Sequence, residues 1–449
     1  MSQWKKVKIG DFLVQYRITI HVQDDKDYKQ VTISSKDGVK FRCIKNGKDI
    51  GRKRQFLIDL KKYPKTVVFT RQGLHEGSIG IAPDNVDGCI ATENMPMFAV
   101  NEDIIHSKYL QYLLKSQIFS DLVATLTPTG SAQKAIHERD LLPLEILIPD
   151  LPEQERIASE ISQKLEKIEQ LSSEIEKQKS YAKQLRANIL QDAIEGKLTA
   201  NWRKKHPVKK GDSDYDADAL FEKIQIEKQE KGKKQKPLPA ITEDEKPFAI
   251  PTGWKWVRLG DLVIDITSGS REWAKYYSES GALFLRMGNL SKNSFNLRLD
   301  NLQYVNVPDN SEGKRTRLQA GDLLFSITAD IGNLGLIPEN FQEAYINQHT
   351  ARIRFLERQR TTFFPYVLLS PCLKSQYLPN AHGMKNSFRL DTLSFLKIPL
   401  PPLAEQNEIV ARVEKHLETI TQLETQIATR ETLTKQLMQG LLKDAFEEK

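Results

Sequence analysis

Two stretches of the chain, 153–197 and 405–449, place apolar residues at spacings that alternate between three and four. This a/d pattern predicts a long helix that buries one narrow stripe against another helix. Neither stretch contains proline, and each has a single glycine. The stripe residues are Ile157, Ile161, Ile168, Leu171, Ile175, Ala182, Leu185 and Ile189 in the first stretch, and Ile409, Val413, Ile420, Leu423, Ile427, Leu437 and Leu441 in the second.

The two stretches are copies of each other. They align without a gap at an offset of 252 residues, and about 17 of the 45 paired positions are identical. A helix of about 45 residues is roughly 65 Å long, which is too long to bury its stripe against one small domain. We expect the two helices to bury their stripes against each other. The alternative, in which each helix pairs with a different protein, remains open.

The repeat extends beyond the helices. The opening phrase WKKVKIGDF at Trp4 returns as WKWVRLGDL at Trp254, and residues 66–85 match residues 322–340 as a strand, a glycine-containing loop and a strand that ends at a proline turn. Further matches pair the helical residues 108–116 with 365–375, and the entry to the first helix, 130–154, with 383–406. The chain is therefore one unit of mixed region plus long helix used twice, and the greater divergence of the mixed regions suggests two related but different targets.

These patterns divide the chain into five segments. The middle one, 199–250, is rich in charge and proline and poor in apolar residues, so we expect a polar linker with a short helix at 218–230. Its basic run Lys231–Lys236 is typical of a solvated segment; a phosphate-contacting role is the alternative. The segments are a first mixed domain at 1–150, a first spacer helix at 151–198, the linker at 199–250, a second mixed domain at 251–402 and a second spacer helix at 403–449.

Composition limits the class of protein. The 449 residues are 39% hydrophobic and 28% charged, as expected for long solvated helices. No apolar run approaches 18 residues, so no membrane span is expected, and the first residues lack the core of a signal peptide. Three scattered cysteines fit a reducing cytoplasm and neither a disulfide framework nor a zinc site.

The net charge of +7 is unevenly distributed. Residues 1–150 carry a net +4 and residues 251–402 a net +5, whereas the helical stretches carry −1 and −3. A phosphate backbone would be attracted to the two mixed regions, hereafter the first head (1–150) and the second head (251–402). The excess is modest and does not by itself indicate nucleic-acid binding.

Motifs of catalysis are missing from the sequence. It contains no G-x-x-x-x-G-K-[ST], no G-x-G-x-x-G, no H-E-x-x-H and no Asn/Asp-Pro-Pro-aromatic stretch. Asp192, Glu195 and Lys197 superficially resemble a nuclease set, but they lie at the end of the predicted helix. We therefore expect a chain without catalytic residues, cofactor or metal.

The sequence resembles the specificity subunit of type I restriction–modification enzymes. The residues that carry the resemblance are IPTGWKWVRLGDL, GDLLFSITADIGNLGLIPEN, the Pro-Pro-Leu-x-Glu-Gln entry at 401–406, and ILQDAIEGKLT followed by Trp202. The first half departs slightly, with Pro149-Asp-Leu-Pro-Glu-Gln at its helix entry. The resemblance covers essentially the full length in the order head, helix, head, helix.

The resemblance implies a fold and a function. The fold would be α+β: two mixed α/β target-recognition domains joined by a long antiparallel two-helix coiled coil in a pseudo-two-fold internal repeat. Each domain would read one half of a split sequence in double-stranded DNA, and the coil would set the spacing. Two methyltransferase subunits and two motor–nuclease subunits would join it in the cytoplasm. Half-sites read from one face of DNA lie roughly 34–36 Å apart, which a rigid coil of this length can span.

Residues that read base edges are bidentate donors or acceptors displayed on loops, with Arg or Lys for guanine and Asn or Gln for adenine. The resemblance does not assign them, because the heads are the most variable part of the family, and a residue of each of these types is more often an ordinary solvated or structural side chain. The candidates are Arg71, Gln72, His75, Ser131, Gln133 and Lys134 in the first head, and Arg271, Lys275, Arg286, Asn289, Lys385, Asn386 and Arg389 in the second.

Several other residues have a plainer interpretation. Arg52, Lys53 and Arg54 form an exposed turn that could contact phosphate. Trp273 is expected to pack in a core rather than stack on a base, and His349 is expected to be structural or exposed. For the chain as a whole, the alternative to DNA recognition is a coiled-coil adaptor that joins other proteins through its helices.

Overall fold

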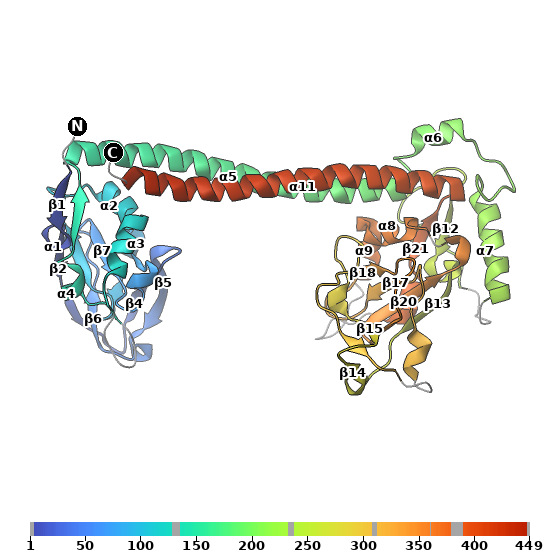
Figure 1. Cartoon of the computed structure of the whole chain (residues 1–449), viewed down its shortest axis with the longest axis horizontal. Coiled ribbons are helices and arrows are strands. Elements are labelled where there is room, and N and C mark those ends of the chain that lie inside the picture. Colours follow the sequence, from blue (N-terminus) through green and yellow to red (C-terminus); the bar gives the residue numbers. More distant parts are fainter. Residues whose placement is uncertain are drawn as a thin grey trace. The chain divides into compact units, whose positions relative to one another are not determined.

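The computed structural model describes residues 4–127, 135–231, 238–307, 312–359, 361–378 and 389–446. The chain forms two compact units. Unit 1 comprises residues 1–177 and 427–449, and unit 2 comprises residues 178–426. Each unit therefore holds one head and a stretch of both long helices (Figure 1).

The two long helices are present at the predicted positions. α5 (Leu151–Ile194) and α11 (Leu403–Phe446) contain 44 residues each, and their ends match at the same offset of 252 residues. Pro152 is the second residue of α5. It is tolerated there because the N–H groups of the first helical turn have no partner within the helix.

The helices pair with each other, and the direction of pairing is antiparallel in each unit. In unit 1, Ile157 and Ile161 from the start of α5 lie in one hydrophobic cluster with Phe446 from the end of α11. In unit 2, Ile189 from the end of α5 clusters with Ile409 from the start of α11. Intramolecular pairing is thus confirmed.

The buried stripe is narrower than predicted. Positions seven residues apart in α5 are buried, whereas the intervening stripe leucines are largely exposed, up to 56% at Leu437. One of the two a/d sets therefore lies in the seam, and the other lies at its edge, where the partner helix covers it only partly. The buried set is Ile161, Ile168, Ile175, Ala182 and Ile189; the exposed set is Leu171, Leu185, Leu423 and Leu437.

The first head is built from three sheets and short helices. Its four-stranded sheet has the order β2-β10-β7-β8, its five-stranded sheet the order β3-β6-β9-β4-β5, and β1 pairs with β11. The strands are β1 (Lys5–Lys8), β2 (Leu13–Tyr16), β3 (Thr19–His21), β4 (Asp27–Ser34), β5 (Gly38–Asn46), β6 (Arg54–Leu57), β7 (Thr66–Phe69), β8 (Ile79–Ile81), β9 (Ile90–Ala91), β10 (Met97–Val100) and β11 (Glu145–Ile148). The helices are α1 (Ile9–Phe12), α2 (Ser107–Leu113), α3 (Gln117–Ala124) and α4 (Glu138–Leu141).

The second head repeats part of this plan. Its sheets have the orders β13-β20-β17-β18 and β14-β16-β15-β19, and β12 pairs with β21. The strands are β12 (Lys255–Arg258), β13 (Val263–Ser268), β14 (Tyr277–Ser278), β15 (Ala282–Leu285), β16 (Tyr304–Val305), β17 (Leu323–Ser326), β18 (Leu334–Leu336), β19 (Ala344–Ile346), β20 (Thr350–Phe355) and β21 (Lys397–Leu400). The helices are α8 (Phe363–Leu369), α9 (Pro371–Tyr377) and α10 (Leu390–Ser394).

The predicted strand–loop–strand match is confirmed, because β7 and β8 pair antiparallel in the first head as β17 and β18 do in the second. The matched helical segments share a cap. Ser116 caps α3 and Ser370 caps α9, each accepting a hydrogen bond of 3.3 Å from a backbone N–H three residues on. Ser116 and Ser370 are therefore structural counterparts.

Each head is fastened to its long helix by a buried glutamine. Gln154 donates hydrogen bonds to the carbonyl oxygens of Ile104 and Pro149, at 3.1 and 2.9 Å. Gln406 donates in the same way to the carbonyl oxygen of Pro401, at 3.0 Å. Both glutamines are almost completely buried. The repeated Glu-Gln in the sequence thus marks the joint between strand and helix.

The segment 199–250 was expected to be a linker, and its described residues are instead folded onto the second head. They include α6 (Ala200–Lys205) and α7 (Ala217–Lys231), the latter close to the predicted helix at 218–230. Leu220 and Ile224 of α7 are fully buried in the main hydrophobic cluster of unit 2. Charged and exposed residues are so numerous in α7 that its composition does not reveal the apolar face that it buries. Beyond Lys231, the rest of the basic run lies outside the described residues.

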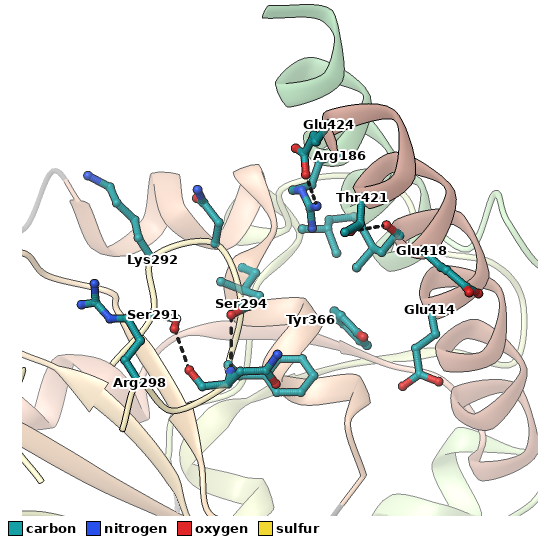
Figure 2. A pocket seen from close by; sticks show the side chains of 16 residues that line it. Arg186, Ser291, Lys292, Ser294, Arg298, Tyr366, Glu414, Glu418, Thr421 and Glu424 are labelled. Atoms are coloured by element: carbon teal, nitrogen blue, oxygen red, sulfur yellow. Dashed lines mark hydrogen bonds and ion pairs between the residues drawn. The ribbon is translucent and has the colours of Figure 1, made fainter. Parts of the chain in front are cut away.

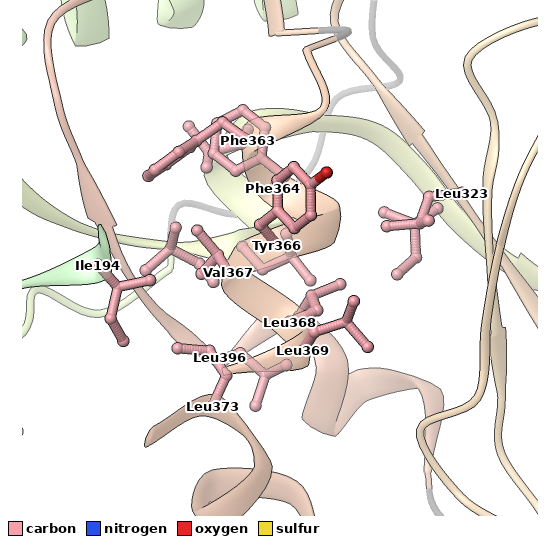
Figure 3. Packing of buried hydrophobic residues seen from close by; sticks show 14 of the residues in the cluster. Ile194, Leu323, Phe363, Phe364, Tyr366, Val367, Leu368, Leu369, Leu373 and Leu396 are labelled. Carbon is pink, nitrogen blue, oxygen red and sulfur yellow. The ribbon is translucent and has the colours of Figure 1, made fainter. Parts of the chain in front are cut away.

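The seven residues of α8 are all buried, and all of them except Pro365 belong to the same cluster. Figure 3 shows Ile194, the last residue of α5, to one side of Val367, and Phe363, Phe364 and Tyr366 belong to the same cluster. Just beyond Ile194, Gly196 adopts a left-handed φ of +71°, and a Cβ there would lie 2.7 Å from the Pro251 side chain. Glycine therefore allows α5 to end against the start of the second head.

Candidate nucleic-acid interface

Three first-head candidates lie in the loop between β7 and β8. Leu74, in the 3-10 turn Leu74–Glu76, is buried and anchors this loop, and Gly77 closes it with a φ of +82°. Gln72 and His75 on either side of Leu74 are exposed. The loop therefore displays these two side chains from a fixed base, as a reading loop requires.

Arg71 is held by a carboxylate. Its Nε and Nη2 donate hydrogen bonds to the two oxygens of Glu138, at 2.9 and 2.7 Å, and both side chains are mostly buried. Gln15 and Arg17 also donate to Glu138. Burial alone would raise the pKa of Glu138, but the hydrogen bonds from Arg71 and Gln15 lower it to about 2. Arg71 therefore braces the loop against α4, and little of its side chain is left to read a base.

In the second head, Arg271 and Lys275 flank a buried aromatic residue. Trp273 packs on Phe284 and Tyr345 with ring centroids 4.8 and 5.6 Å away, which confirms that it belongs to a core. Arg271 is exposed, and Lys275 forms an ion pair with Glu272 at 3.2 Å. Glu272 has a left-handed φ of +62°, a strained conformation typical of functional loops.

Arg286 and Asn289 lie at a polar cavity of about 510 Å³ in the second head. Asn289 is only 3% exposed. Its side-chain oxygen accepts from the backbone N–H of Arg286 at 2.9 Å, and its nitrogen donates to the carbonyl oxygens of Arg298 and Asn301. The Asn289 amide is thus committed to holding the loop, which corrects the expectation that it is displayed to a base.

Other side chains at this cavity were not singled out from the sequence. Arg298, Asn301 and Asn347 line it together with His349. Thr328 Oγ1 and Gln348 Nε2 lie 3.0 and 2.9 Å from the two ring nitrogens of His349, so its structural interpretation agrees with the contacts. The spacing of these residues in the sequence matches no motif, because they come from three separate loops that only the fold brings together.

Of the remaining candidates, one lies within the described residues and five lie outside them. Arg389 is exposed and lies 3.9 Å from Asp391. Ser131, Gln133, Lys134, Lys385 and Asn386 lie outside the described residues. In the basic turn, Arg52 lies 4.0 Å from Glu93 and Lys53 pairs with Asp24, so part of its charge is already neutralised.

Within the described ranges, no group of three or more His, Cys, Asp or Glu residues is arranged to hold a metal ion. None of the helices in those ranges combines the length and the apolar character needed to cross a membrane.

Comparison with known proteins identifies the repeated unit. A family model described as the type I restriction modification DNA specificity domain matches the chain twice, over residues 1–180 and 251–430. The chain belongs to this family. Each match covers one head and the first part of the long helix that follows it, so the specificity domain is the repeated unit of head and helix.

Several specificity subunits are similar in sequence. The chain is 27% identical to the type I restriction enzyme EcoAI specificity subunit of Escherichia coli over 252 residues, which are 55% of this chain and 41% of that protein. It is 23% identical to the EcoKI specificity subunit of Escherichia coli strain K12, over 77% of this chain and 66% of that protein. The matched stretch thus spans less than half the length of the EcoAI relative.

A solved structure shares the fold. It comes from a study titled as the structural basis underlying complex assembly and conformational transition of the type I R-M system. The TM-score is 0.64 at 20% identity, with 99% of this chain and 97% of that chain covered. The predicted fold class, with two mixed heads and a long helical pair, is therefore confirmed.

Proposed function

We propose that the chain is the specificity subunit of a type I restriction–modification complex. Each head reads one part of a split target in double-stranded DNA, and partner subunits carry out methylation and restriction. The observation that carries the proposal is the double match of the DNA specificity domain, once on each head. Two unlike heads on one repeated scaffold suit two unlike half-sites.

The reading surface would be formed by exposed loops of the heads. In the first head, the fixed loop that displays Gln72 and His75 supports this role. In the second head, the exposed Arg271 and the half-buried Arg286, which lines the cavity of about 510 Å³, support it. Gln pairs with adenine and Arg with guanine in the major groove. The five candidates outside the described residues belong to the same proposal.

The chain itself would carry no catalytic step. The proposed complex contains two methyltransferase subunits and two motor–nuclease subunits, one of each for each repeat, and it acts in the cytoplasm. The exposed leucines on α5 and α11 support docking of partner subunits there, because apolar side chains on a helix face gain from being covered. The same leucines would also suit an adaptor protein, which is the second candidate function.

A head exchange separates these two functions. Residues 1–150 are replaced by the corresponding head of another family member, and the complex with its methyltransferase partner is expressed in cells. Genome-wide methylation mapping then gives the target. One half of the split target should change while the other half stays the same. A change in both halves, or in neither, would contradict one reader per head, and a chain that directs no methylation at all would favour the adaptor.

A further inference from the structure

The carboxylate of Glu405 joins three separate segments of unit 2. Glu405 lies in the first turn of α11 and is almost completely buried. Its Oε2 accepts a hydrogen bond from Trp254 Nε1 at 2.7 Å, and its Oε1 accepts from Thr199 Oγ1 at 2.6 Å and from Arg203 Nη1. Thr199 and Arg203 lie beyond the end of α5, whereas Trp254 directly precedes the first strand of the second head. One side chain thus connects both long helices with the second head.

Residues 199–216, which follow α5, also complete the start of α11 through their backbone. The N–H of Leu403, the first residue of α11, donates to the carbonyl oxygen of Ser213 at 3.2 Å. The next N–H, that of Ala404, donates to the carbonyl oxygen of Asp214 at the same distance. The first N–H groups of a helix have no partner within it, so these two bonds help to fix the direction in which α11 begins.

The corresponding carboxylate of the first repeat is engaged within its own helix. Glu153 lies at the position of Glu405 at the offset of 252 residues, and its two oxygens accept from Arg156 at 2.7 Å each. The backbone N–H of Glu153 donates to the side chain of Asp150 at 3.1 Å, so the first turn of α5 is capped from its own joint. Among the described residues, the buried glutamine is therefore common to both joints, whereas a carboxylate that links separate segments belongs to the second.

The second head also packs against α11 through apolar side chains. Phe363 and Val367 of α8 belong to the same hydrophobic cluster as Ile409 and Val413 of α11. Apolar burial holds two elements together without a preferred direction, whereas a hydrogen bond weakens steeply when its donor and acceptor are misaligned. The bonds of Glu405 therefore restrain the angle between the second head and α11 more sharply than the cluster does.

Beside this cluster the packing leaves room. A cavity of about 730 Å³ lies between the loop 291–298 of the second head, α8 and the two long helices. Figure 2 shows Lys292 and Arg298 on one side of this cavity and Glu414 and Glu418 of α11 on the other. Because side chains do not fill this space, the packing on this side would allow the head to tilt towards α11 or away from it.

We propose that Glu405 is a positioning residue that holds the second head at one angle on α11, and that this angle limits the split DNA target to one spacer length. This inference rests on the proposed function. Base pairs of duplex DNA rise about 3.4 Å each, so a head that moves its reading loops by that distance along the duplex meets a half-site one base pair nearer or farther. The spacer would then depend on the joint as well as on the length of the helices.

The test uses matched substitutions in the two repeats. Glu405→Ala removes the acceptor of all three bonds, and Thr199→Val removes one donor while it keeps the shape of the side chain. The control is Glu153→Ala, which removes the same side chain from the other joint. Each full-length chain is expressed in cells with its methyltransferase partner. Methylation mapping then counts modified sites with the wild-type spacer and with spacers one base pair shorter or longer.

Glu405→Ala should lower methylation at the wild-type spacer several-fold and raise methylation at the altered spacers several-fold, because a head that tilts reaches more than one distance. Thr199→Val should shift this ratio in the same direction by less, since Arg203 and Trp254 still bond the carboxylate. The bases read in each half-site should stay the same, because the reading loops are untouched. Glu153→Ala should keep the wild-type ratio.

A uniform loss of methylation with an unchanged ratio in the Glu405 and Thr199 variants would overturn the proposal, since Glu405 would then only stabilise the fold. Full methylation with an unchanged ratio would overturn it as well, and so would a change in the bases that are read.

If the wild-type chain directs no methylation of a split sequence, the proposed function fails instead, and the spacer claim fails with it. Hydrogen exchange of the Lys255–Arg258 amides in the full-length chain then decides whether Glu405 holds the head. Exchange that is no faster in Glu405→Ala than in Glu153→Ala would overturn that role, whereas faster exchange would support it.

Discussion

The indole Nε1 of Trp254 donates a hydrogen bond of 2.7 Å to Glu405 Oε2. This bond ties the start of the second head to the first turn of α11. Thr199 and Arg203 donate to the other oxygen, Oε1, and Glu405 is only 2% exposed. In the first repeat, the counterpart Glu153 pairs with its helical neighbour Arg156 and is partly exposed.

The two glutamates should therefore respond differently to the same change. Glu405→Ala leaves Arg203 and the indole N–H of Trp254 without their buried partner, and removing one member of a buried pair costs about 3–5 kcal/mol. Glu153→Ala removes an exposed pair that contributes about 1 kcal/mol or less. Thermal unfolding of the two variants measures the difference. Equal shifts of the two midpoints would show that the Glu405 cluster does not stabilise the joint.

The packing of α7 gives a matched pair of substitutions two residues apart. Ile224 is fully buried, whereas Ile226 is 56% exposed. Ile224→Ala should lower the free energy of unfolding of unit 2 by about 2–5 kcal/mol, because it removes buried apolar surface and leaves a cavity. Ile226→Ala should change it by about 0.5 kcal/mol or less. Urea titration checks both variants, and a harmless Ile224→Ala would mean that α7 is a linker after all.

Acid should loosen the reading loop of the first head. The pKa of Glu138 is about 2 in the folded protein, against an ordinary value of 4.5. A lowered pKa stabilises the fold above about pH 4.5, and that contribution, about 2–3 kcal/mol, is lost as the pH falls towards 2. Glu138→Gln should thus be less stable than the wild type at pH 7 and nearly equal to it near pH 2.

The control for this pH series is Glu145→Gln in the same head. Glu145 pairs with Lys6 at 2.6 Å, but both side chains are exposed. Its substitution should leave the unfolding midpoint almost unchanged across the range. A Glu138→Gln midpoint that runs parallel to the wild type from pH 7 to pH 2 would refute the role of the Arg71–Glu138 pair.

The helical pair should lengthen in steps of seven residues. The buried positions of α5 recur every seven residues, so only an insertion of a whole heptad preserves the stripe. One heptad added to each of α5 and α11 extends the pair by about 10 Å. If the helices set the spacing of the half-sites, methylation mapping should show an unread spacer longer by about three base pairs, which rise about 3.4 Å each. Four-residue insertions serve as the control, because they break the stripe and should reduce methylation.

Much of the fold could be predicted from the sequence, because its strongest features are periodic or repeated. The 44-residue helices, their pairing and the strand–loop–strand match needed only spacing and self-comparison. The fold of segment 199–250 could not be predicted in this way. Its buried apolar residues, among them Leu220 and Ile224, are few, and they are interspersed with charged residues.

The candidate site was less predictable for a different reason. Arg71 and Glu138 lie 67 residues apart, and only the folded head brings them together. Asn289 has a side chain that can read a base. In the folded head its amide is buried and donates to the carbonyl groups of residues up to 12 positions away. The residue type shows which groups a side chain can bind. The tertiary structure decides which of its donors and acceptors are already engaged within the protein.

Phe446 is almost fully buried in the core of the first head, where its ring lies 5.2 Å from that of Tyr109. Unit 1 therefore combines residues from both ends of the numbering, whereas unit 2 is one continuous stretch. Since domains fold as units while the chain is being synthesised, the second head can complete its core first. All the residues of unit 2 precede position 427, whereas the core of the first head includes Phe446, so a chain released within the last turns of α11 holds every residue of one unit and lacks part of the core of the other.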